Sequence, residues 1–107
     1  MQKFDPKYEA LFTPWQVGNV EIKNRIVMCP MGGTSLFGWF ELGGCHFDKE
    51  AAKLFLERAN NNVGLIIPGI APLRDTFWGK WLWQNPKMFE ELKVFMDEIH
   101  KTGAKLF

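Results

Sequence analysis

The side chains best suited to metal binding or nucleophilic chemistry are two cysteines, Cys29 and Cys45, and the neighbouring His46. Thiolate and imidazole groups bind zinc when about four of them recur at short, regular spacing. Here Cys45 and His46 are adjacent, but Cys29 lies far from them and no further pair follows. The sequence therefore predicts no metal centre. Cysteine is also too scarce for a disulfide scaffold, so both are interpreted as thiols of a reducing compartment.

Two carboxylates and one lysine could in principle take part in catalysis. Asp48 and Glu50 stand at the start of a predicted helix, where carboxylates accept hydrogen bonds from free N–H groups and complement the helix dipole. We therefore interpret them as capping residues. Lys80 lies in an aromatic segment and could pair with a substrate carboxylate, although a lone loop lysine is usually solvated. The sequence names no catalytic acid, base or nucleophile.

Composition and missing motifs exclude several classes of function. Neither G-x-G-x-x-G nor G-x-x-x-x-G-K-[ST] occurs, which disfavours a dinucleotide-binding Rossmann site or a P-loop. A net charge of +1 gives no reason to expect nucleic acid or an anionic membrane as partner. No segment reaches the roughly 18 apolar residues that span a bilayer, and residues 1–10 lack a signal-peptide core. We expect a cytoplasmic protein with no membrane partner.

The most unusual segment is the triplet Lys23-Asn24-Arg25, which leads into an apolar run ending at Cys29 and is followed by Pro30-Met31. Continuous apolar runs are typical of strands that are covered on both faces, as in parallel sheets. Two interpretations stay open on these residues alone. The segment is either a core strand that a proline ends, or a strand whose end forms part of a binding site.

The remaining pattern predicts a hairpin, three strands and two helices. A hairpin is indicated over residues 15–22, around Gly18-Asn19, with Gly18 supplying a positive φ. Apolar runs predict strands at residues 25–29, 63–67 and 104–107. One helix begins after Asp48 and ends at residues 60–62; its apolar stripe is Ala52, Phe55, Leu56 and Ala59. The second is capped by Asn85, begins at Pro86 and stops at Gly103; its apolar stripe is Met88, Leu92, Phe95 and Ile99.

Alternating strands and helices predict an α/β fold with parallel strands joined by right-handed crossovers. The strands recur somewhat more widely than the roughly 30 residues per unit of a (β/α)8 barrel. The additional residues lie in the loops that follow the strands, where such barrels build their sites. Because the chain stops inside a predicted strand, we expect residues 1–107 to form an incomplete domain.

The sequence resembles the opening of the NADH:flavin oxidoreductase/old yellow enzyme family. The matching residues are Leu11-Phe12-x-Pro14, the hairpin, and residues 23–31 with the pattern K-N-R-I-V-M-x-P-M. Residues 64–67 and 69–72 resemble the family's second strand, particularly in its 2-enoate and 2,4-dienoyl-CoA reductase branch. The resemblance extends from Leu11 to Phe107. It implies the N-terminal part of a (β/α)8 TIM barrel, preceded by a β-hairpin and inactive by itself.

The resemblance also implies a flavin-contacting edge. The residues that would lie along the flavin ring are Cys29, Pro30, Met31 and Gly32, and Gly69 (Ile70 in a gap-free alignment) would make room for it. A proline without N–H and a glycine without side chain suit backbone that lies flat against a planar cofactor. Many family members carry Thr or Cys where Gly32 stands, so tuning of the flavin potential is either lost or taken over by Thr34.

The function implied for the complete enzyme is ping-pong hydride transfer from NAD(P)H through FMN to an activated C=C bond. The substrates would be enoates, enones or enoyl thioesters, all small unsaturated carbonyl compounds. An iron–sulfur cluster or FAD would be held only by regions that follow this segment, and association with further copies of the chain stays open. Two alternatives remain: a truncated, non-catalytic remnant of the family, or a βαβαβ binding module that closes its sheet by self-association.

The aromatic segment Trp78–Trp83 has two interpretations as well. It either packs as a flap or interface over the mouth of the barrel or forms a wall of the substrate site.

Overall fold

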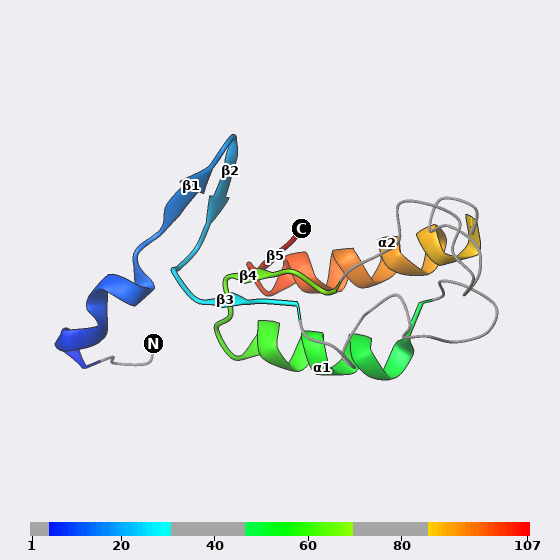
Figure 1. The fold of residues 1–107 in the computed structure, drawn as a ribbon, viewed down its shortest axis with the longest axis horizontal. Coiled ribbons are helices and arrows are strands. Elements are labelled where there is room, and N and C mark those ends of the chain that lie inside the picture. The colour runs from blue at the N-terminus through cyan, green and yellow to red at the C-terminus, as the bar shows by residue number, and fades with distance from the viewer. Residues whose placement is uncertain (1–4, 31–46, 70–85) are drawn as a thin grey trace.

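The computed structural model describes residues 5–30, 47–69 and 86–107 (Figure 1). In chain order the elements are η1 (Pro6–Phe12), β1 (Trp15–Val17), β2 (Val20–Ile22), β3 (Val27–Met28), α1 (Lys49–Asn60), β4 (Leu65–Ile66), α2 (Pro86–Lys101) and β5 (Lys105–Leu106). Strand and helix alternate from β3 onward. The predicted hairpin, three strands and two helices are therefore all present.

The central sheet has three strands in the order β3-β4-β5, and both pairings are parallel. Val27 pairs with Leu65, and Ile66 pairs with Leu106. The regular strands are shorter than the predicted segments 25–29, 63–67 and 104–107. At β3, the Arg25 backbone N–H donates to Leu11 C=O at 2.8 Å and not to β4, whose pairing begins at Ile26 C=O. Apolar runs mark buried segments, whereas a strand extends only where its neighbour pairs with it.

Helix α1 begins where a side chain satisfies its free N–H groups. The Asp48 carboxylate accepts hydrogen bonds from the backbone N–H of Glu50 at 3.0 Å and of Ala51 at 3.1 Å. The helix ends at Asn60, and Asn62 adopts a positive φ of 74° that turns the chain back toward the sheet. The predicted capping role of Asp48 is confirmed, and α1 leads directly into β4.

Helix α2 starts at Pro86, where the missing proline N–H costs no intrahelical bond. Gly103 adopts a φ of +86° just beyond its end, as predicted for a glycine that stops a helix. Asn85, the expected cap, lies outside the described residues. The turn at Gly103 directs the chain into β5.

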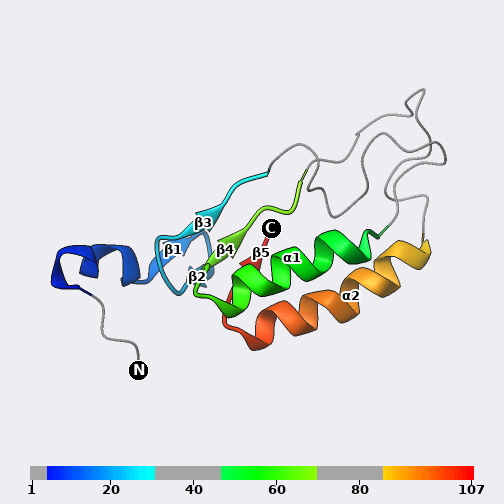
Figure 2. The same cartoon turned by 90° about the horizontal axis from the view of Figure 1, so that it is seen from below.

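Both helices cover the same face of the sheet and lie side by side (Figure 2). Their buried residues meet the sheet in one apolar cluster of Ala52, Phe55, Ala59, Ile66, Phe95, Ile99 and Ala104. Leu56 and Leu92, expected in the two stripes, are half-buried at the margin of this cluster. Burial of a large apolar side chain contributes about 1.5–3 kcal/mol, so this cluster holds the helices and the sheet together.

The hairpin and η1 lie on the amino side of the three strands (Figure 1). Trp15 pairs with Ile22, and Gly18 has the expected positive φ, 59°. The 3-10 helix η1 was not predicted from the sequence. Its start is stabilised by Asp5, whose carboxylate accepts a hydrogen bond from Lys7 N–H at 3.0 Å, and none of its residues is buried.

Among the helices within residues 5–30, 47–69 and 86–107, none is both long enough and apolar enough to cross a membrane.

Candidate functional site

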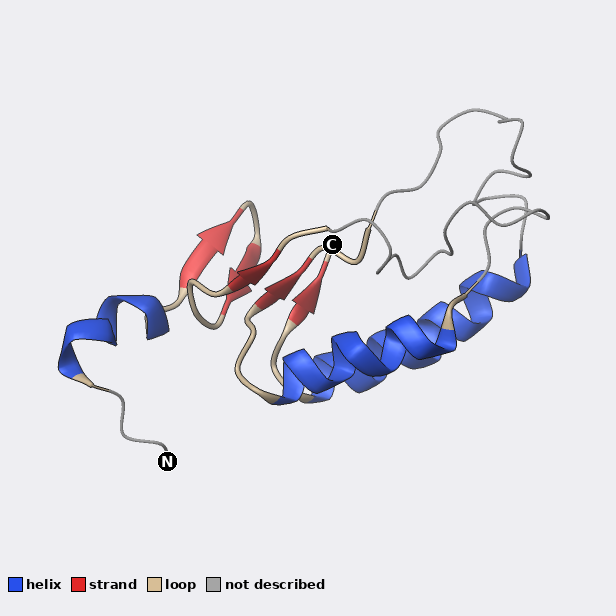
Figure 3. Cartoon of the chain, turned by 60° about the horizontal axis from the view of Figure 1, so that its bottom comes forward, coloured by secondary structure: helices blue, strands red, loops and turns tan. Residues whose placement is uncertain are grey.

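The sequence-predicted site lies at the edge where the parallel strands β3 and β4 end. Cys29 and Pro30 follow β3, residues 67–69 follow β4, and Phe107 follows β5 at the same edge (Figure 3). In (β/α)8 barrels this carboxyl edge carries the active site.

Backbone hydrogen bonds extend the sheet by one residue at this edge. Ile67 N–H donates to Met28 C=O at 3.0 Å, and Phe107 N–H donates to Ile66 C=O at 3.0 Å. These bonds bring the exits of the three strands together. The structure therefore places Cys29 and Pro30 beside the segment that leads to Gly69, although these residues are far apart in the sequence.

The described residues at this edge carry no charged side chain. Cys29 and Pro30 are exposed, and Cys29 is a free thiol. Pro68 is buried below the edge, whereas Gly69 is half-buried with a φ of 131°. A β-carbon would be strained at that φ, so this position favours glycine. Of the described residues that follow the three strands, only Cys29 carries an ionisable side chain.

Several residues of the sequence-based hypotheses fall outside the described residues. These are Met31, Gly32, Thr34, Cys45, His46, Ile70, Lys80 and the aromatic segment Trp78–Trp83. Their predicted roles stay predictions.

The opposite, amino edge of the sheet carries Asn24, the one buried polar residue of the described core. Its Nδ2 donates to Asn62 C=O at 2.7 Å, and its Oδ1 accepts from Ile26 N–H at 3.0 Å. Its backbone C=O accepts from Trp15 Nε1 at 2.6 Å. Asn24 thus joins the hairpin, the start of β3 and the turn before β4. Since an unsatisfied buried amide is costly, this side chain fixes their positions.

The two neighbours of Asn24 make further connections at the same edge. Lys23 Nζ donates to Thr102 C=O at 3.0 Å, which joins the hairpin to the turn after α2. The Arg25 guanidinium donates to Thr13 and Pro14 C=O, both at 3.3 Å, and its Cζ lies 5.8 Å from the Trp15 ring centroid. The Lys-Asn-Arg triplet therefore stabilises the fold by joining the hairpin to the sheet and to the turns that follow both helices. For these three residues, the structure supports the structural interpretation.

Gly64 was missed as a key residue by sequence reasoning. A β-carbon added there would collide with Oδ1 and the side-chain carbon of Asn24. Gly64 thus permits the close approach of Asn24 to the start of β4. A signal was present in the sequence, since a glycine inside an otherwise apolar strand often marks a close approach of another group.

The acidic residues at the start of α1 do not form a site. Asp48 caps the helix, and Glu50 accepts a hydrogen bond from Lys53 Nζ at 3.0 Å on the surface. Across the described ranges, no group of three or more His, Cys, Asp or Glu side chains could hold a metal ion.

Residues 10–107 match the family described as NADH:flavin oxidoreductase / NADH oxidase. The match covers the hairpin, the amino-edge triplet and the carboxyl edge alike. The chain belongs to this family. This family member also resembles cinnamate reductase from Clostridium sporogenes, with 32% identity over 94% of the chain. The aligned part is 16% of that relative's length, so the chain spans a small part of the curated protein that it matches.

Solved structures of the family share the fold. The old yellow enzyme from Trypanosoma cruzi superposes with a TM-score of 0.65 and 23% identity, over 94% of this chain and 26% of that one. A variant of morphinone reductase in complex with tetrahydroNAD superposes with a TM-score of 0.63 and 22% identity, over 91% and 25%. The described residues thus have the fold of the N-terminal part of a (β/α)8 barrel with its N-terminal hairpin.

Proposed function

We propose that residues 1–107 form the N-terminal segment of an FMN-binding barrel in an NAD(P)H-dependent oxidoreductase that reduces activated C=C bonds. The single observation that carries this proposal is the composition of the carboxyl edge in a chain of this family. Cys29 and Pro30 are exposed there beside the exit of β4, with no charged side chain among the described residues.

The carboxyl edge fits a planar, largely apolar ring. Pro30 presents no N–H that would need a partner, and Gly69 presents no side chain at a φ of 131°. Met28 C=O already accepts a hydrogen bond from Ile67 N–H at 3.0 Å, so this carbonyl needs no partner on the ring. We assign Cys29, Pro30 and Gly69, with Met31 and Gly32, to the surface that holds the isoalloxazine ring.

Bound FMN would supply the hydride-transfer chemistry, which no side chain of this segment can perform. The chain's own contribution is placement. The ladder of β3, β4 and β5 fixes the exits of the strands, and the apolar surface of Pro30 excludes water from one side of the ring. We assign no proton transfer to Cys29, because no described acid or base lies beside it at this edge.

The relative supports a class of substrate. Cinnamate reductase is named for an unsaturated carboxylate, and the matched segment includes the carboxyl edge. We therefore propose enoates, enones or enoyl thioesters as substrates, NADH or NADPH as reductant, and a cytoplasmic location in which the Cys29 thiol stays reduced.

The test is an anaerobic titration of the protein at its full natural length. We expect the purified protein to carry FMN, identified by chromatography after denaturation. NADH or NADPH should bleach the flavin absorbance, and addition of cinnamate or a cyclic enone should restore it. The matched control is cinnamate whose double bond has already been reduced. This compound should leave the flavin absorbance bleached.

Two results would contradict the proposal. The first is a folded protein that neither contains nor takes up FMN, which would favour a non-catalytic remnant or a binding module. The second is a flavin that pyridine nucleotides reduce but that no unsaturated carbonyl compound reoxidises.

A further inference from the structure

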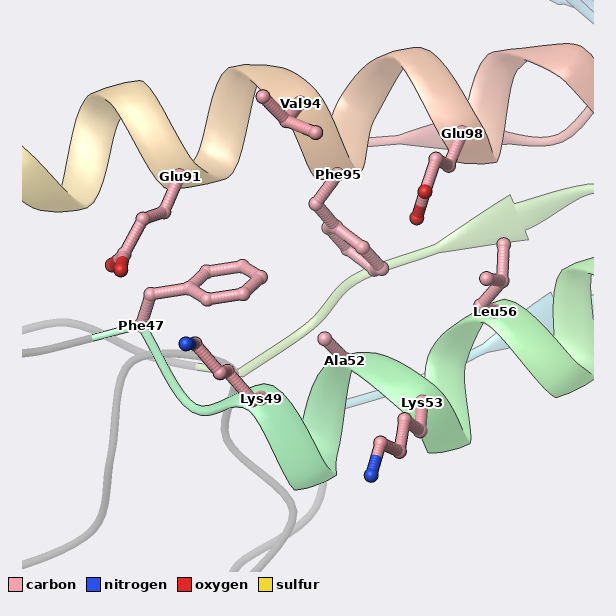
Figure 4. Close-up of a pocket in the computed structure, with 9 residues that line it drawn as sticks. All are labelled: Phe47, Lys49, Ala52, Lys53, Leu56, Glu91, Val94, Phe95 and Glu98. Atoms are coloured by element: carbon pink, nitrogen blue, oxygen red, sulfur yellow. The ribbon is translucent and has the colours of Figure 1, made fainter.

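An apolar groove of about 390 Å³ lies between the N-terminal half of α1 and α2 (Figure 4). Its apolar lining comprises Phe47, Ala52, Leu56, Val94 and Phe95, and its charged lining comprises Lys49, Lys53, Glu91 and Glu98. The rings of Phe47 and Phe95 meet edge to face at 5.7 Å and form part of the floor.

The floor of the groove reaches the core, because Ala52 and Phe95 also belong to the apolar cluster between the helices and the sheet. The deepest helix positions of that cluster, such as Phe55 and Ile99, are at most 1% exposed and do not line the groove. Val94, by contrast, is 64% exposed on the wall of the groove. In a (β/α)8 barrel the helices form the outer ring, so further strands and helices extend the ring sideways and leave this groove facing outward.

The charges around the groove are sorted by helix. Both lysines come from α1, and both glutamates come from α2 (Figure 4). Along the groove, Lys49 and Glu91 lie near one end, while Glu98 lies toward the other (Figure 4). One wall is thus positive and the other negative, on either side of an apolar floor.

We propose that this groove is an isologous interface with a second copy of the chain, related by a two-fold axis that runs parallel to the groove. Such an axis places α1 of each copy against α2 of its partner. Every lysine row then faces a glutamate row, while the exposed surfaces of Val94 and Phe47 are covered by the partner. A two-fold axis perpendicular to the groove would instead oppose lysine to lysine and glutamate to glutamate. The sorted charges therefore select the parallel arrangement.

The lysines do not contribute equally to this interface. Lys53 already contacts Glu50 of its own helix at 3.0 Å, and both side chains are largely exposed. Lys49 and Glu91 should therefore carry most of the selectivity. Interactions between exposed charges weaken as salt rises, because the Debye length falls from about 10 Å at 0.1 M to about 3 Å at 1 M. Dimerisation should weaken accordingly.

The experiment uses two charge-reversed variants of the full-length protein, followed by sedimentation at a series of concentrations. Lys49→Glu with Lys53→Glu makes both walls negative, and Glu91→Lys with Glu98→Lys makes both walls positive. Each variant alone should dimerise at least about tenfold more weakly than the unmodified protein, since four exposed pairs turn repulsive. An equimolar mixture of the two should form a heterodimer of near-normal affinity. Lys7→Glu with Lys93→Glu, which makes the same change in net charge as the reversal of Lys49 and Lys53 but at residues that do not line the groove, should leave dimerisation unchanged.

Restored association on mixing, in variants whose circular dichroism matches the unmodified protein, would support the proposal. It is overturned by a protein that stays monomeric at all concentrations, by dimers that the reversals do not weaken, or by folded variants that fail to pair on mixing. Protection of the groove from hydrogen exchange that persists on dilution would assign it to another segment of the same polypeptide and would also overturn the proposal. If either variant misfolds, Val94→Lys at the exposed wall provides the same test and should weaken association.

Discussion

The two edges of the β3-β4-β5 sheet differ in how they use side chains. At the amino edge, Lys23 and Asn24 bond backbone carbonyls of the turns after both helices. At the carboxyl edge, the described contacts between the strand exits are backbone hydrogen bonds, and Cys29 and Pro30 stay exposed. Side-chain hydrogen bonds stabilise the amino edge, whereas the carboxyl edge exposes the side chains of Cys29 and Pro30.

Under the proposed function, this difference separates stability from flavin binding within one small sheet. In (β/α)8 barrels, residues at the bottom hold the fold and residues at the top perform the chemistry. Substitutions at the amino edge should therefore lower the free energy of unfolding. Substitutions at the carboxyl edge should leave that free energy nearly unchanged and alter flavin binding instead. The following predictions test this separation, in order of expected effect on stability.

Asn24→Ala should cause the largest loss, about 3 kcal/mol of unfolding free energy, because alanine cannot replace the two part-buried hydrogen bonds that the buried Asn24 amide makes. Urea unfolding monitored by circular dichroism measures it. The matched control is Asn61→Ala, which removes an exposed hydrogen bond to Glu57 C=O and should cost about 0.5 kcal/mol. Equal losses of unfolding free energy at the two positions would mean that Asn24 stabilises the fold no more than an exposed asparagine does.

Gly64→Ala should cost about 2 kcal/mol, because the new methyl group collides with the Asn24 side chain. The double variant with Asn24→Ala should lose clearly less than the sum of the two single losses, since the collision disappears. A double-mutant cycle from urea unfolding measures this coupling. Strict additivity would show that the two residues do not press against each other.

Lys23→Met should cost about 1 kcal/mol. It retains most of the aliphatic chain beside Gly103 but removes the part-buried bond from Nζ to Thr102 C=O. The control is Lys53→Met, whose ammonium contacts only exposed Glu50 among the described ion pairs. A Lys23 variant that is as stable as the Lys53 control would mean that the bond from Nζ to Thr102 C=O does not stabilise the fold.

Cys29→Trp should change the unfolding free energy of the flavin-free protein by no more than about 0.5 kcal/mol, because the side chain is exposed. Its bulk should nevertheless weaken FMN binding by at least about tenfold, equivalent to 1.4 kcal/mol. Fluorescence titration with FMN measures the affinity. A variant that binds FMN normally would place the ring elsewhere.

Local signals made much of the fold predictable from the sequence. Asp48 caps the turn that follows it, Pro86 starts α2, and Gly103 ends it through its own φ. The short strands were harder to delimit, because pairing depends on neighbours and not on apolar character alone. The η1 helix was not predicted, although Asp5 followed by Pro6 is a typical signal for the start of a helix.

The amino-edge contacts could not be derived from spacing. Lys23 and Thr102 are 79 residues apart, and Asn24 and Asn62 are 38 apart, so only the folded chain brings them together. At the carboxyl edge, the positions of Cys29, Pro30 and Gly69 after their strands were predictable. Their contact with flavin is a prediction that rests on the family and on the shape of this edge.

The most direct test is the alkylation of Cys29 with N-ethylmaleimide, followed by peptide mass spectrometry, in protein with and without FMN. An Asn19→Cys substitution in the hairpin turn supplies an exposed reference thiol on the amino side of the same molecule. At an FMN concentration about ten times the dissociation constant, Cys29 should react about tenfold more slowly, while the reference thiol should react at its usual rate. Equal rates at Cys29 with and without bound FMN would contradict the assignment of the carboxyl edge to the flavin.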